Sequence, residues 1–83
     1  MSHKEIKDQI GELKTEVENA PKETSVFEGV LHEAAETLER YTPEALKDFA
    51  ETLQREAADF EVEHPRITEL INNVVTSLTN LGI

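Results

Sequence analysis

Glutamate and histidine side chains at helical spacing are the residues of this sequence that could bind a metal ion. Glu61-x-x-His64 has the spacing from which di-iron helical bundles are built, but those sites need two copies and two further inward-facing glutamates. The sequence holds one copy, and its histidine precedes Pro65, where a helix is expected to end. We therefore interpret His64 as a helix cap or an exposed residue.

A second row of possible ligands consists of Glu28, His32 and Glu36, spaced four residues apart on one face of an expected helix. Such a row could hold a divalent cation weakly, but it is more typical of a solvated charged face. The absence of cysteine removes thiolate ligands and disulfides from consideration. We predict neither a metal site nor a cofactor.

Motifs for nucleophilic catalysis are missing as well. The glycines stand alone and form no phosphate-binding loop. Ser25 opens an expected helix, the place where acyl carrier proteins bear their phosphopantetheine arm. Carriers have an aspartate before that serine, whereas this chain reads Thr24-Ser25-Val26. We expect no enzyme, and a carrier modified on Ser25 remains an unfavoured alternative.

The clearest pattern is an apolar residue every four and three positions near both ends of the chain. This spacing places a narrow apolar stripe along one side of a helix, and a stripe needs a partner helix to cover it. We predict that the stripes form the interface of a homodimer or of a complex with another protein, and the alternative is that they form the core of the chain's own bundle. The candidate interface residues are Ile6, Ile10, Leu13, Val17, Ile67, Leu70, Ile71, Val74, Leu78 and Leu81.

The stripes, together with the residues that begin and end helices, predict an all-α fold. It is a small antiparallel bundle of four helices that forms a single domain over residues 1–83. The expected helices cover 3–19, 25–41, 43–62 and 65–81, with the first two forming a hairpin and Gly82 ending the last. Thr42-Pro43 supplies an N-cap and a proline at the first helical position. The heptad register runs unbroken across His64-Pro65, so one long kinked helix is the alternative, although proline inside a helix costs ~3 kcal/mol.

The net charge of −10 comes from eighteen acidic and eight basic side chains among 83 residues. This balance argues against binding to nucleic acid or to anionic membranes. No apolar run is long enough for a membrane span or a signal peptide, so we expect a cytoplasmic protein. Residues 65–83 carry only Arg66 and Glu69, and we interpret the fourth helix as central or as an interface helix.

These observations favour a self-associating or partner-binding helical module without catalysis, with a homodimer as the expected state. The alternative from another class is an inhibitor of a basic protein that mimics nucleic acid. Its acidic ridge would draw on residues 43–64, which carry seven acids.

Two motifs carry a resemblance to a known family. The segment Phe60-Glu61-Val62-Glu63-His64-Pro65 and the chain end Leu81-Gly82-Ile83 resemble a family of short acidic proteobacterial proteins, the domain-of-unknown-function family 4404. The resemblance covers both ends, about two thirds of the chain, and is less clear over 20–45. It implies a cytoplasmic bacterial protein and supplies no activity, cofactor or site residue.

Overall fold

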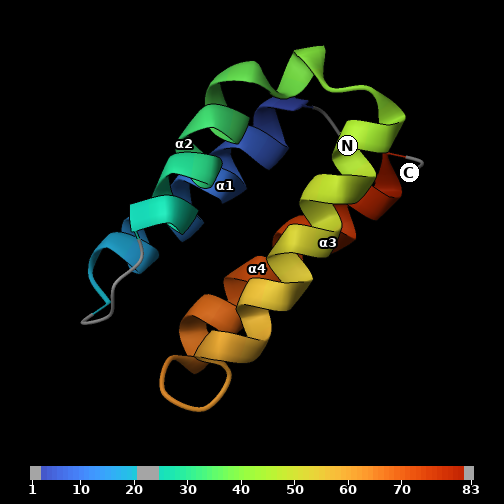
Figure 1. The fold of residues 1–83 in the computed structure, drawn as a ribbon. Coiled ribbons are helices and arrows are strands. Elements are labelled where there is room, and N and C mark those ends of the chain that lie inside the picture. Colours follow the sequence, from blue (N-terminus) through green and yellow to red (C-terminus); the bar gives the residue numbers. More distant parts are fainter. Residues whose placement is uncertain (1–2, 21–24, 82–83) are drawn as a thin grey trace.

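Four α-helices and one short 3-10 helix make up the part of the chain that the structure describes, residues 3–20 and 25–81 of a computed structural model. The elements are α1 (His3–Glu18), α2 (Ser25–Thr37), η1 (Leu38–Arg40), α3 (Pro43–Phe60) and α4 (Pro65–Asn80) (Figure 1). This confirms the predicted all-α bundle of four helices. The expected end of the last helix at Gly82 lies outside the described residues.

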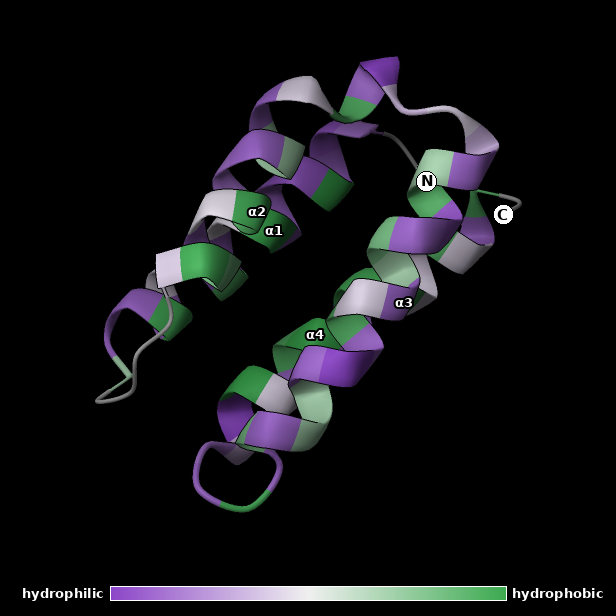
Figure 2. Ribbon diagram, viewed as in Figure 1, coloured by the Kyte–Doolittle hydropathy of each residue, from purple (hydrophilic) through white to green (hydrophobic). Residues whose placement is uncertain are grey.

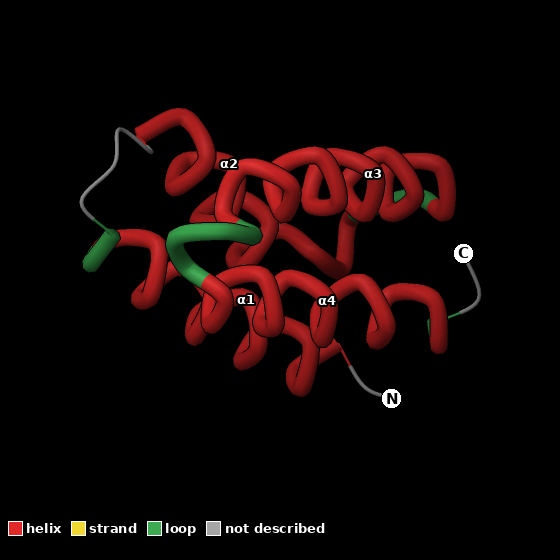
Figure 3. Tube along the Cα trace, turned by 90° about the horizontal axis from the view of Figure 1, so that it is seen from below, coloured by secondary structure: helices red, strands yellow, loops and turns green. Residues whose placement is uncertain are grey.

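The helices form two antiparallel hairpins, α1 with α2 and α3 with α4, as predicted for the first pair. Figure 3 shows the hairpins side by side, so that α1 and α4 make one layer and α2 and α3 the other. α1 and α4 pack directly against each other, whereas no Cα atom of α2 lies within 8 Å of one in α3. The two hairpins are therefore joined mainly through the layer of α1 and α4.

Residues 61–64 form a non-helical connection between α3 and α4, so the alternative of one long kinked helix is wrong. The carbonyl of Phe60 accepts a hydrogen bond from the His64 N–H at 2.8 Å, and the carbonyl of His64 then accepts one from Ile67 N–H at 3.0 Å. Pro65 takes the first position of α4, where its missing N–H leaves no bond unmade. His64 thus occupies the predicted cap position with its backbone, but its side chain makes no capping hydrogen bond.

The second helix ends earlier than predicted, because the chain tightens into η1 before it turns into α3. Tyr41 has extended backbone angles (φ −72°, ψ 131°), and its N–H donates to the Leu38 carbonyl. The side chain of Thr42 then accepts a hydrogen bond from Ala45 N–H at 3.1 Å, which confirms the predicted cap of α3. Leu38, fully buried, keeps this tight turn on the core.

Apolar bands recur along every helix (Figure 2), and the core is one cluster that all of them enter. Two ring pairs lie in or beside this core, one between α2 and α3 and one between α3 and the residue that precedes Thr42. The rings of Phe27 and Phe60 lie 6.1 Å apart. Tyr41 and Phe49 meet edge to face, also at 6.1 Å. Ring pairs of this kind contribute about 0.5–1.5 kcal/mol each beyond the area they bury.

Polar contacts fix how α1 lies against its neighbours. The buried Ser77 of α4 donates its Oγ hydrogen to Oε1 of Gln9 at 2.7 Å. On the other side of α1, Lys7 pairs with Glu39 of η1. The hydrogen bond from Lys7 holds the pKa of the Glu39 carboxyl below its usual value.

Candidate functional site

The predicted interface residues lie inside one chain. Ile6, Ile10, Leu13 and Val17 are fully buried, as are Ile71, Val74 and Leu78, while Ile67 and Leu70 are at most 5 % exposed and Leu81 is partly buried against the core. The stripe of α1 faces the stripe of α4, and both help to fill the protomer's own core. In this conformation they offer no surface to a second protein.

A different surface remains on α4. Its exposed residues beyond the first two turns are uncharged: Asn72, Asn73, Thr76, Thr79 and Asn80. We call this set the neutral face of α4. The low charge of this helix therefore does not come from burial of these residues within the chain. α4 is central, since it packs against both α1 and α3, yet its outer face is open to solvent.

The charges of α4 are confined to its beginning. Arg66 donates to Glu69 Oε1 at 3.2 Å and to Glu12 Oε1 of α1 at 3.1 Å. Arg66 and Glu69 together contribute no net charge to α4. The neutral face thus begins after a helix end whose two charged residues are paired. The whole of α4 adds nothing to the chain's net negative charge.

Charge is divided unequally between the two layers. Residues 25–64, which contain α2, η1 and α3, carry eleven acidic and three basic side chains, a net charge of −8. The described residues of the layer formed by α1 and α4 carry six acidic and four basic ones, a net charge of −2. The neutral face of α4 therefore belongs to the less charged side of the molecule.

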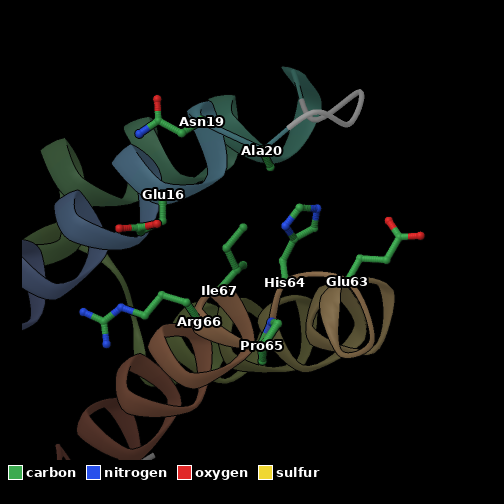
Figure 4. A pocket seen from close by; sticks show the side chains of 8 residues that line it. All are labelled: Glu16, Asn19, Ala20, Glu63, His64, Pro65, Arg66 and Ile67. Carbon is green, nitrogen blue, oxygen red and sulfur yellow. The ribbon is translucent and has the colours of Figure 1, made fainter.

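A shallow cleft of about 270 Å³ opens where α1 ends and α4 begins (Figure 4). Ile67 and the ring of His64 point into it, and Glu63 points away. The His64 ring also lies edge-on to Phe60, with centroids 6.0 Å apart. Acidic and basic side chains both line the cleft.

The residues that the sequence suggested for metal chemistry are not assembled into a ligand set. Within residues 3–20 and 25–81, no group of three or more His, Asp or Glu side chains could hold a metal ion. His32 and Glu36 lie 3.3 Å apart, Nε2 to Oε1, as an exposed pair on one helix. Glu61 follows the last residue of α3 and is exposed, while His64 is partly buried in the cleft beside Phe60.

The sequence contained one signal of the neutral face, the lack of charge after Glu69. Periodicity separated buried from outward positions in α4 correctly, but it did not show which outward positions the neighbouring helices leave uncovered. Which face of a helix stays open is decided by the packing of all four helices. That packing leaves Thr76 and its neighbours in solvent.

These features define a small antiparallel helical protein whose apolar stripes are used internally. The family model described as "Domain of unknown function (DUF4404)" matches residues 6–83, and the chain belongs to this family. The match confirms the resemblance of the two terminal motifs and extends it through the middle of the chain. No curated protein and no solved structure matches this chain. Among the described residues, no helix is both long and apolar enough to cross a membrane.

Proposed function

We propose that this protein is a non-catalytic module that binds a protein partner, another copy of itself or a different chain, through the neutral face of α4. The observation that carries the proposal is the lack of charge on an exposed helix face in a chain of net charge −10. The apolar stripes do not serve this purpose, because they are buried in the protomer's own core.

The cost of removing side chains from water supports this choice of surface. Burying an unpaired charge at an interface is far more expensive than burying an amide or a hydroxyl that finds a hydrogen-bond partner. Charged residues are accordingly depleted at the centre of protein interfaces. The exposed side of α3, by contrast, carries Glu44, Asp48 and Glu51 among others, as is typical of a helix face that stays in water.

The alternative of a nucleic-acid-mimicking inhibitor would use the opposite layer, where eight of the ten net negative charges lie. The two functions differ in their response to salt. Binding of a basic partner to the acidic layer weakens as salt screens the attraction. Contact through the neutral face has no such attraction to lose.

In-cell photo-crosslinking tests the proposed surface. A photoreactive amino acid replaces Thr76 on the neutral face, or Arg55 on the exposed side of α3 as the matched control. We expect a discrete protein-protein adduct from position 76 and none from position 55. Adducts from position 55 alone would favour the inhibitor function, and equal or absent adducts at both positions would contradict the proposal.

A further inference from the structure

We propose that the partner of the neutral face of α4 is a second copy of this chain, packed with its α4 antiparallel about a twofold axis near Thr76. The inference rests on the proposed function and goes further by naming the partner. Its basis is self-complementarity: in a twofold dimer, one surface patch must bind an identical patch.

A strongly acidic face fails this requirement, because it has too few basic side chains to pair with the acids of an identical face. The layer of α2 and α3, with net charge −8, would repel its own copy. Asparagine and threonine side chains each contain both a hydrogen-bond donor and an acceptor. Identical Asn and Thr residues can therefore pair with one another, and the neutral face of α4 has this composition over more than two turns.

The direction of packing follows from the charges at the start of α4. In a parallel pair, each Glu69 would lie beside Glu69 of the second copy. In an antiparallel pair centred on Thr76, the two Glu69 residues lie seven residues to either side of the centre, about 21 Å apart at 1.5 Å per residue. Antiparallel helix dipoles also attract each other. The centre then brings Thr76 against Thr76, and Asn72 against Asn80 of the second copy.

The contact is small, so the dimer is weak. An antiparallel pair centred on Thr76 overlaps only over residues 72–80 of each α4, about 13.5 Å at 1.5 Å per residue, so the contact lies below the roughly 1,200–2,000 Å² that stable interfaces bury. Two chains of net charge −10 also repel each other over the Debye length, which shrinks from about 30 Å at 0.01 M salt to about 10 Å at 0.1 M. Self-association should therefore strengthen as salt is added.

Sedimentation equilibrium over a range of protein and salt concentrations tests this dimer. We expect a monomer–dimer equilibrium that shifts toward dimer at higher salt. The variants T76E and T76K place like charges at the twofold axis, and each should weaken self-association at least about tenfold. R55Q is the control, since it changes the net charge as much as T76E does but lies on α3. Circular dichroism verifies that every variant remains folded.

A mixture of T76E and T76K provides the decisive comparison, because opposite charges then meet at the axis. The mixture should associate more tightly than either variant alone. A wild type that stays monomeric in high salt, or a T76E variant that associates as R55Q does, would overturn the proposal. If the crosslinking at position 76 captured a different protein in that case, the proposed partner-binding function would stand while the dimer would not.

Discussion

At the scale of single residues, Val74 and Val62 show how the effect of a substitution on stability depends on whether the side chain is buried or exposed. Val74 is fully buried between the helices, and Val62 is 90 % exposed in the connection between α3 and α4. V74D would leave a charge in the core with no described basic side chain buried beside it, at a cost of at least about 3 kcal/mol of unfolding free energy. V62D makes the same chemical change in water and should stay within about 0.5 kcal/mol of wild type.

Urea unfolding of the two valine variants, followed by circular dichroism in dilute protein, measures this difference. A V74D protein as stable as V62D would mean that the core is not packed as described.

His64 is partly buried, between the fully buried Val74 and the exposed Val62. Its backbone caps α4 and its ring lies on Phe60, so it contributes to packing rather than only to a cap.

At the scale of helices, α1 contains a residue that weakens it. Gly11 lies in the middle of α1, and a Cβ atom added there would meet nothing within 4 Å. Glycine in a helix interior costs about 1 kcal/mol relative to alanine. G11A should therefore raise the unfolding free energy by about 0.5–1 kcal/mol, measured by thermal or urea unfolding. A destabilised variant would contradict the open space described around Gly11.

The helices were predictable from the sequence because local patterns determine them. The spacing of Ile6, Ile10, Leu13 and Val17 corresponds to one helix side, and all four are buried. The boundary before Pro65 was predictable, because a proline disfavours helical angles in the residue before it, although α3 ends at Phe60 rather than at residue 62. The 3-10 turn around Leu38 had no comparable signal, since its sequence continues the helical pattern and only tertiary packing tightens it.

The arrangement of the helices was less accessible. Nothing in the sequence states that α2 and α3 stay apart or that Phe27 meets Phe60 between them. The same limit explains the interface prediction. An apolar stripe requires a cover, but whether the cover comes from the same chain or from another depends on how the hairpins pair. Here α1 and α4 cover each other.

At the scale of the whole molecule, the two layers differ in net charge. The layer of α2 and α3 carries most of the negative charge, which keeps the chain solvated and repels other copies at long range. The layer of α1 and α4 carries little net charge and presents the neutral face. An association surface on the less charged side lets two acidic chains meet while their charged layers point away from each other.

The central claim is that two copies of this protein meet through the outer face of α4 while the apolar stripes stay within each chain. Backbone amide NMR spectra recorded during dilution at high salt test it most directly. We predict concentration-dependent shifts confined to the neutral face, with Thr76 near their centre, and unchanged shifts on the outer face of α3. Shifts concentrated at stripe residues such as Ile10 and Ile71 would mean that chains exchange helices. Either that result or spectra independent of concentration would contradict the account.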